Sequence, residues 1–408
     1  MADLYAHRKA ERNIRFIGAD GNPISGKDIK ITQVGHKFLF GCGAFDSLAY
    51  VYPEMPEDIR PMFGDRVDKW LKVFNYGTLP FYWGQYEKVE GEPDFEGRMN
   101  AAKLCTKNGA KVKGHPLCWH TACADWLMKY DNKTIMDKQL ERINRDVSAF
   151  KGVIDMWDVI NEVVIMPIYD RYDNAITRIC KQYGSVNLVK EVFNAAKAAN
   201  PDSVLLINDF NLSDKYAKLI ADCLDAGVPI SAIGLQTHQH QGYMGEEKLR
   251  EVLDRFSVFG LPLHFTENTL VSGAIMPPEI VDLNDFQPES WPSEPEGEDR
   301  QCREWREMYE ILFSHPLVEA LTGWDFADGA WLNAPSGFIR KDGTVKPSYE
   351  MVNNLVHNEW CTKDTVHTDA DGMAKIHGFK GSYKAEIDSH EGKFELLEEG
   401  DTIICKLS

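Results

Sequence analysis

Long apolar segments are absent from this chain of 408 residues. No run of about 18 apolar residues, the length that a transmembrane helix needs, occurs in it. The opening stretch, MADLYAHRKAERNIRF, carries charges where a signal peptide has its apolar centre. We therefore expect no membrane span, and a cytoplasmic protein or a secreted one from which a signal has been removed.

Positive charge is in short supply. The chain has 45 Lys and Arg residues against 63 Asp and Glu residues, and its formal net charge is −18. An acidic surface repels the phosphates of nucleic acids and anionic membranes, so neither is expected as a partner. A neutral substrate is compatible with this charge.

Cysteines with the spacing of a metal or redox motif are also missing. The nine cysteines are an odd number and include no CxxC pair. Because Cys42, Cys118 and Cys180 stand in apolar, strand-like runs, we expect them to be buried free thiols. This use of cysteine is typical of a reducing compartment.

The central part of the chain alternates short β-like runs with longer amphipathic segments. One of these segments, 188–200, repeats Ala, Leu and Phe at helical spacing. Eight β-like runs in such an alternation predict the α/β fold of a (β/α)8 TIM barrel. The runs are 38–45, 73–83, 112–120, 156–164, 204–211, 232–238, 261–268 and 321–328. After the seventh run, the Pro-rich and acidic stretch 276–301 is expected to form a long loop before a helix.

The two ends of the chain have a different pattern. Residues 12–34 and 364–408 alternate apolar and polar positions around the turns ADGNP, DADG, HEGK and EEGD, which predicts β-hairpins. We expect both ends to meet in a small β-sandwich beside the barrel. The predicted division is 1–34 and 361–408 for this small β-domain and 35–360 for the barrel.

Polar and aromatic side chains gather at the ends of the predicted strands. In a (β/α)8 barrel the carboxyl ends of the strands form one mouth, where the chemistry takes place. The set therefore predicts a single site that contains carboxylates, amides, imidazoles and indoles. Its members are His115, Trp119, His120, Asn161, Glu162, Asn208, Asp209, Gln236, His238, Glu267, Trp324 and Trp331.

Two carboxylates with amide and Trp neighbours suit the hydrolysis of glycosides. One carboxylate attacks the sugar, and one carboxylic acid with a raised pKa protonates the leaving oxygen. Trp rings offer flat apolar faces to pyranose rings, and amides bind hydroxyl groups. In the motif WDVINE we expect Asn161 to orient the sugar through its 2-hydroxyl and Glu162 to donate the proton.

The motifs together resemble glycoside hydrolase family 10, the (β/α)8 endo-1,4-β-xylanases, over roughly residues 35 to 357. WDVINE is similar to the family's acid/base motif and HFTEN to its nucleophile strand, which implies Glu162 as acid/base and Glu267 as nucleophile. The resemblance implies a retaining enzyme that needs no cofactor or metal and cleaves xylan or xylo-oligosaccharides. The substrate-binding residues that it implies are His115, Trp119 and His120 in GHPLCWH, then Asn161, Asn208, Gln236, His238, Trp324 and Trp331. It also implies a hydrogen bond from His238 to the nucleophile.

Two stretches depart from the family pattern. The second strand, NYGTLPFYWGQYE, has Pro80 and Phe81 where the family usually has Glu and Asn. We expect Phe81, Tyr82 and Trp83 to form an aromatic wall against the substrate, and activity on long, undecorated xylan to be low. Thr269 stands two residues after Glu267, where the family often has Asp.

Three other interpretations remain open at this point. His238 and His240 form an HxH pair, a spacing that also serves metal-dependent hydrolases. The altered second strand also suits a barrel that binds carbohydrate without cleaving it. A third is a β-glycosidase of the same fold that acts on a decorated or non-xylan glycan.

Overall fold

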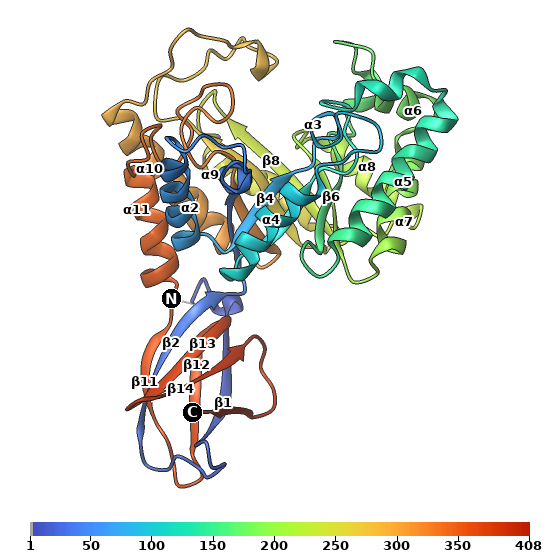
Figure 1. Cartoon of the computed structure of the whole chain (residues 1–408). Coiled ribbons are helices and arrows are strands. Elements are labelled where there is room, and N and C mark those ends of the chain that lie inside the picture. The colour runs from blue at the N-terminus through green and yellow to red at the C-terminus, as the bar shows by residue number, and fades with distance from the viewer. Residues whose placement is uncertain (1–2) are drawn as a thin grey trace.

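Eight parallel strands close into a barrel in the computed structural model, which describes residues 3–408 (Figure 1). The strands are β3 (Leu39–Gly43), β4 (Tyr76–Pro80), β5 (Lys111–His115), β6 (Met156–Asn161), β7 (Val204–Asp209), β8 (Ala232–Gln239), β9 (Leu263–Leu270) and β10 (Val318–Gly323). They pair in chain order, and β10 closes the ring against β3. The predicted (β/α)8 barrel is confirmed.

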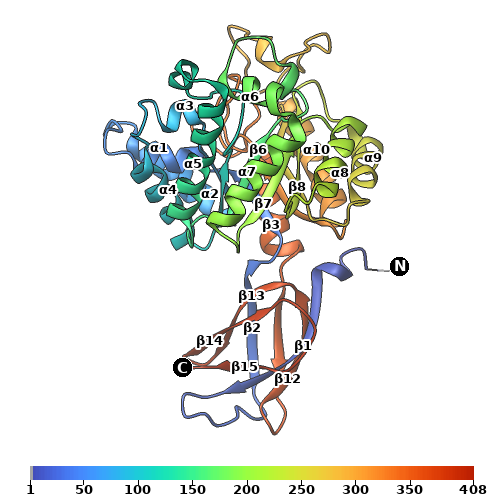
Figure 2. The same ribbon diagram turned by 90° about the vertical axis from the view of Figure 1, so that its right-hand side faces the viewer.

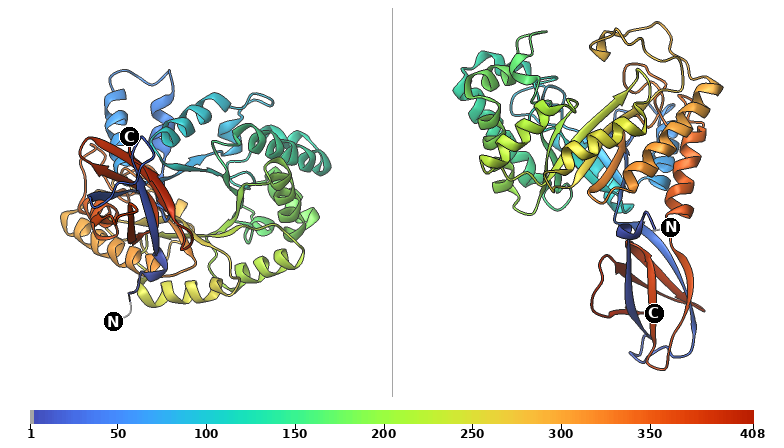
Figure 3. Two further views of the ribbon diagram at one scale, coloured as in Figure 1. Left: turned by 90° about the horizontal axis from the view of Figure 1, so that it is seen from below. Right: turned by 180° about the vertical axis from the view of Figure 1, so that it is seen from behind.

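Helices surround the barrel, as the view from below shows (Figure 3). They are α1 (Phe45–Val51), α2 (Arg60–Val73), α3 (Trp83–Tyr86), α4 (Phe95–Lys107), α5 (Asn132–Phe150), α6 (Ala175–Tyr183), α7 (Ser185–Ala199), α8 (Asp214–Asp225), α9 (Gly245–Ser257), α10 (Pro295–Phe313) and α11 (Pro347–Asn354). Shorter helical turns are η1 (Ala6–Arg8), η2 (Asp125–Lys129), η3 (Met166–Ile168), η4 (Leu283–Asp285) and the π-helical turn η5 (Leu355–Glu359). The predicted loop 276–301 is too long, because α10 begins inside it at Pro295, a residue that favours the first helical position.

The main apolar core lies between the strands and the helices. Buried Leu, Ile, Val and aromatic side chains from every barrel strand pack there against the inner faces of the helices. A much smaller cluster, Leu39, Tyr76 and Ala320 with Met156, lies apart from it and consists only of strand residues. Successive side chains of a barrel strand point alternately inward and outward, so this cluster lies inside the barrel. This alternation decides which residues reach the mouth.

The two ends of the chain together form a small two-sheet unit (Figure 2). One sheet has the order β12-β1-β15 and the other β11-β2-β13-β14. The strands are β1 (Lys9–Ile17), β2 (Asp28–His36), β11 (Lys363–His367), β12 (Met373–Phe379), β13 (Gly381–Ile387), β14 (His390–Leu396) and β15 (Ile403–Lys406). Ile14 and Phe16 of the first sheet share one apolar core with Ile31 and Tyr383 of the second. The sandwich built from both termini is therefore present, while the exact domain boundaries stay a prediction.

Three of the four predicted hairpins are wrong. Only the hairpin at HEGK is present, because β13 and β14 are antiparallel partners, and its turn is Asp388 and Ser389, just before HEGK. Across ADGNP, DADG and EEGD the chain passes from one sheet to the other. Alternating polarity marks a half-buried strand, but it does not say in which of two packed sheets the next strand lies.

The sandwich is attached to the floor of the barrel, opposite the mouth. The starts of β3 and β7, at Leu39 and Val204, line the same pocket as Phe379 of the sandwich. The guanidinium of Arg8 donates hydrogen bonds of 2.9, 2.7 and 2.6 Å to three carbonyl groups beside β10. This end of the molecule therefore takes no part in the site at the mouth.

Two further expectations concern the whole chain. In residues 3–408, no helix combines the length and apolar character needed to cross a membrane. All nine cysteines are free, and Cys42, Cys118 and Cys180 are buried. Cys180 lies in α6, however, and not in a strand.

Candidate active site

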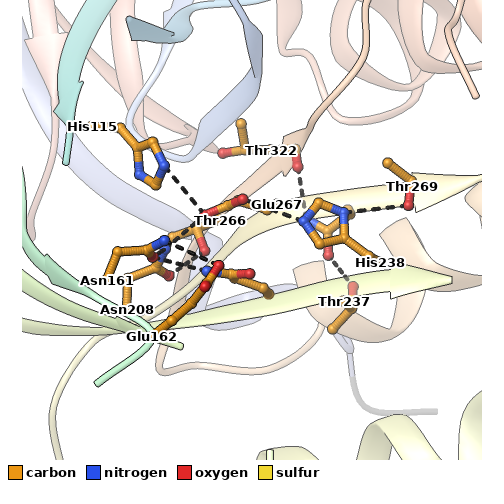
Figure 4. Close-up of polar contacts among 12 residues, drawn as sticks. His115, Asn161, Glu162, Asn208, Thr237, His238, Thr266, Glu267, Thr269 and Thr322 are labelled. Atoms are coloured by element: carbon orange, nitrogen blue, oxygen red, sulfur yellow. Dashed lines mark hydrogen bonds and ion pairs between the residues drawn. The ribbon is translucent and has the colours of Figure 1, made fainter. Parts of the chain in front are cut away.

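Glu162 directly follows β6 and Glu267 lies within β9, and Figure 4 shows both side chains in one network of polar contacts. Glu162 follows the last residue of its strand and has a φ of 57°, in the left-handed region that non-glycine residues seldom adopt. Its N–H donates a hydrogen bond of 2.8 Å to the carbonyl of Asn208 on the next strand. Backbone strain of this kind is characteristic of functional positions.

Side-chain amides connect the two carboxyl groups. Asn208 Nδ2 donates to Glu267 Oε1 at 2.7 Å and to Asn161 Oδ1 at 2.8 Å. Gln236 Nε2 donates to the same Asn161 oxygen at 2.9 Å. Asn161 Nδ2 then donates to Glu162 Oε1 at 3.2 Å. Asn208 and Gln236 both donate to Asn161 Oδ1, which fixes the orientation of this amide. Its NH2 group must therefore face Glu162.

Glu267 lies in positive surroundings. His238 Nε2 is 3.3 Å from Glu267 Oε2, and His115 Nε2 is 3.8 Å from Oε1. Behind His115, the buried Asp158 carboxylate contacts its Nδ1 at 2.7 Å and Lys113 Nζ at 2.6 Å. Burial alone would raise the pKa of Glu267, but the charge of His115 and the hydrogen bond with His238 outweigh it and lower that pKa. Glu267 is therefore an ionised carboxylate at neutral pH.

Glu162 has the opposite environment. Burial raises the pKa of its carboxyl group to about 8, and the negative charges of Glu267 and Asp209 add to the effect of burial. Trp119 Nε1 donates to Glu162 Oε2 at 2.9 Å, which lowers this pKa in part. One carboxylic acid and one carboxylate thus coexist near neutral pH, the division of roles that glycoside hydrolysis requires.

Thr269 links the two histidines of the HxH pair. Its hydroxyl oxygen lies 3.4 Å from His238 Nδ1, 3.2 Å from His240 Nδ1 and 3.2 Å from the Gln239 N–H, which donates to it. A hydroxyl group has one proton, so it donates to one ring and accepts from the other. If His238 is the acceptor, its proton sits on Nε2 and points at Glu267. Within residues 3–408, no group of three or more His, Cys, Asp or Glu is placed to hold a metal ion.

Replacing Thr269 by Val tests this hydroxyl. The loss of one neutral hydrogen bond, worth about 0.5–1.5 kcal/mol, should lower kcat/KM by about two- to tenfold. Thr269→Ser keeps the hydroxyl and should retain most of the activity, and Thr365→Val on the exposed β11 is the matched control. Steady-state kinetics across pH measure the effect. A Ser variant as impaired as the Val variant would show that the methyl group, not the hydroxyl, matters.

The other predicted site residues also lie at the mouth. The Trp324 ring is 5.3 Å from His115 and 6.0 Å from His238, measured between centroids. The Trp331 ring lies 4.5 Å from His238. His120 is next to Trp119, with 6.3 Å between their rings. The structure thus brings together the strand-end residues proposed from the sequence, apart from two on the second strand.

The exceptions are Phe81 and Trp83, so the predicted aromatic wall is wrong in part. Phe81 is completely buried and packs on Phe150 and Trp157, outside the barrel. Trp83 is 4% exposed and packs against Trp126. Phe81 directly follows β4 and continues the outward alternation of Leu79, whereas Trp83 is already the first residue of α3.

The residue that reaches the mouth is Tyr82, which lies between them. Its ring centroid is 5.9 Å from that of His115 and 5.5 Å from that of Trp119. Burial first, and then the charges of Glu267 and Glu162, raise the pKa of its hydroxyl well above the ordinary value. Tyr82 was one of the three residues expected in the wall, and period-two counting from the inward-facing Tyr76 would have distinguished it from Phe81.

The comparisons with known proteins identify the family. A family model described as Glycosyl hydrolase family 10 matches residues 81–355, and this chain belongs to that family. The beta-1,4-xylanase of Dictyoglomus thermophilum is 29% identical over 286 residues, which cover 64% of this chain and 77% of that protein. The endo-1,4-beta-xylanase 1 of Arabidopsis thaliana is 22% identical over 395 residues, covering 93% of this chain but only 36% of that protein.

Solved structures give the same fold. A GH10 endoxylanase from a sugarcane soil metagenome has a TM-score of 0.65 at 20% identity and covers 78% of this chain and 97% of its own. Xylanase 10B of Thermotoga petrophila, in complex with xylobiose, has a TM-score of 0.64 at 20% identity, over 79% of this chain and 95% of that one. Several of the similar proteins are much longer than this chain, which spans about a third to under half of their length.

Proposed function

We propose that this chain is a retaining glycoside hydrolase that cleaves β-1,4-xylosidic bonds in xylan or xylo-oligosaccharides. The observation that carries the proposal is the pair of carboxyl groups with opposite pKa shifts, Glu162 raised to about 8 and Glu267 lowered, joined by one amide network. Membership of glycosyl hydrolase family 10 supports the reaction class. The names of the similar xylanases support the sugar.

The reaction proceeds in two steps. In the first, the Glu267 carboxylate attacks the anomeric carbon while Glu162 gives its proton to the leaving oxygen, so the glycosidic bond breaks and a glycosyl ester forms. In the second, Glu162 takes a proton from water, and the water oxygen attacks the anomeric carbon and releases Glu267. Glu162, Glu267 and the attacking water together supply every proton and electron pair of the two steps, so the proposal needs no metal or cofactor.

The remaining site residues bind the sugar in this proposal. Asn161 donates to the 2-hydroxyl, an interaction that strengthens in the transition state. Trp324 and Trp331 stack on pyranose faces, and Trp119 holds the acid. Polar contacts to sugar hydroxyls come from His115, His120, Gln236 and His238, whereas the buried Asn208 donates both amide protons to Glu267 and Asn161 and positions these two groups. The barrel, residues 35–360, is the catalytic unit, with 1–34 and 361–408 as the attached sandwich.

The stereochemistry of the product tests the two-step mechanism. The proposal requires carboxyl groups about 5–5.5 Å apart and retention of configuration, against about 6.5–9.5 Å for inversion. Xylotetraose hydrolysis followed by proton NMR should therefore show the β-anomer first, before mutarotation produces the α-anomer. Early appearance of the α-anomer would contradict retention.

The same assay, run from xylobiose to xylotetraose, tests the altered second strand. Of the three aromatic residues expected in the wall, only Tyr82 lies at the mouth. Pro80 has no N–H and cannot donate a hydrogen bond to a sugar. Each hydroxyl left without a partner costs about 1–3 kcal/mol, so an added glycone xylose should give little gain in kcat/KM. A steep rise with every added xylose would show that the strand has kept a full subsite.

A further inference from the structure

Two long segments rise from opposite sides of the barrel mouth, and their tips face each other (Figure 1). The first arm, residues 163–174, follows Glu162 and ends at α6. The second arm, residues 271–294, follows β9, the strand of Glu267, and ends at α10. Each arm therefore begins within a few residues of a candidate catalytic carboxyl group.

Two ion pairs of a single arginine join the arms. The Arg171 guanidinium of the first arm donates to Asp285 of the second in bidentate fashion, at 2.9 and 2.7 Å. Its Nε lies 3.1 Å from Asp282 Oδ2. All three side chains are partly exposed to solvent. One arginine thus holds together two segments about 110 residues apart in sequence, at their outermost points.

In each arm, an aromatic side chain packs against a histidine at the mouth. In the first arm, the Tyr169 ring packs on His120 with 4.4 Å between centroids, and the Tyr172 hydroxyl donates to the His120 carbonyl at 3.4 Å. In the second arm, the Trp291 ring lies 5.8 Å from His240. Each of the two arms joined by Arg171 is therefore also packed against a histidine of the site.

The connections that follow the strands between the two arms are short. The strands between β6 and β9 are β7 and β8, and short connections, residues 210–213 and 240–244, lead from them to α8 and α9. The ion pairs thus span the side of the mouth where β7 and β8 end. A ligand that extends from the site in this direction meets the two joined arms.

We propose that Arg171 is a specificity-determining residue: with Asp282 and Asp285 it forms a strap that limits how far a substrate extends beyond the β7–β8 side of the site. The inference rests on the proposed function and adds a substrate class to it. Oligosaccharides enter from the open side and fit under the strap. A long polysaccharide chain is cleaved only where its end threads through, or while the strap is open.

Arg171 stands among four aspartates, so the joining of the two arms depends on this one positive charge. Asp170 and Asp173 flank Arg171 on its own arm, and Asp282 and Asp285 face it on the other. Without the guanidinium, like charges on the two arms face each other and repel. Exposed ion pairs are individually weak and are screened by salt, so the strap can open in the native protein.

The test compares Arg171→Ala with Arg178→Ala. Arg178 pairs with Asp173 at the base of the same arm and makes no contact across the mouth, so it controls for the loss of a charge. In R171A, the ratio of kcat/KM on polymeric xylan to kcat/KM on xylotriose should rise roughly three- to tenfold, the size expected when a few exposed ion pairs are lost. R178A should keep the wild-type ratio. The exchange of Arg171 and Asp285, R171D with D285R, should return it towards the wild-type value.

Salt and hydrogen exchange give independent readings. Sodium chloride should raise the ratio in the wild type and leave it unchanged in R171A. Amide exchange of residues 276–290 should be faster in R171A than in the wild type or R178A. An unchanged ratio, or equal exchange rates in R171A and the wild type, would overturn the strap. If the wild type hydrolyses no xylose-based substrate, the proposed function fails, and exchange alone then decides whether Arg171 holds the arms together.

Discussion

Replacing Glu267 by Ala should remove nearly all turnover, with a loss of roughly four to six orders of magnitude in kcat, as for other enzymes that lose their nucleophile. The variant has no carboxylate to attack the anomeric carbon, and no other group takes its place. Asn208 and His238 contact this carboxylate directly. Steady-state assays on an aryl xylobioside measure the loss, because a good leaving group keeps the residual rate detectable.

An external nucleophile separates a missing carboxylate from a damaged fold. Azide enters the space left by the Glu267 side chain and attacks the anomeric carbon from the same face. The product should then be the glycosyl azide of inverted configuration, formed at a rate that rises with azide concentration. Glu247→Gln, on the exposed face of α9, is the control and should behave as the wild type. Full activity in Glu267→Ala would place the nucleophile elsewhere.

The barrel and most of the site could be predicted from the sequence, because the strand ends of a (β/α)8 barrel meet at one mouth whatever their separation in the chain. Each polar residue that ends a β-like run, such as Asn161 or Asn208, was placed there without knowledge of any distance. The error at the second strand has a specific cause. Phe81, Tyr82 and Trp83 were expected to form one aromatic wall, although the strand ends at Pro80 and a helix begins at Trp83, and of the three only Tyr82 packs against His115 and Trp119.

Other features depend on tertiary contacts that a local pattern does not contain. The opposite pKa shifts of Glu162 and Glu267 follow from burial and from partners on several strands. The three wrong hairpins follow from strands that change sheets at their turns. The contact of Arg171 with Asp285 joins loops whose composition indicates only solvent exposure. The spacing of residues in the sequence therefore predicts neither the pKa shifts, nor the changes of sheet, nor the ion pair.

Replacing Glu162 by Ala should divide substrates by the quality of their leaving groups. General acid catalysis contributes about 10²–10⁴-fold, and a substrate whose leaving group needs no proton does not use it. The first step on xylotetraose should therefore slow by about 10²–10⁴-fold, while the first step on a dinitrophenyl xylobioside should hardly change. The second step also lacks its base, so the glycosyl ester should accumulate and a burst of released phenol should appear. Stopped-flow measurement of this burst isolates the first step.

The pH profile gives the same assignment a second test. Glu162 acts only while protonated, and its pKa is about 8, so kcat/KM on xylotetraose should fall as pH rises through that value. Glu267 acts only while ionised and its pKa is lowered, so the acidic decline should begin below the ordinary range of a glutamate. The dinitrophenyl substrate needs no proton from Glu162, so its alkaline decline should be absent in the wild type and in Glu162→Ala alike, while the acidic decline should remain in both. Equal slowing of both substrates in the first step, or an alkaline limb that survives the mutation, would show that another group is the acid.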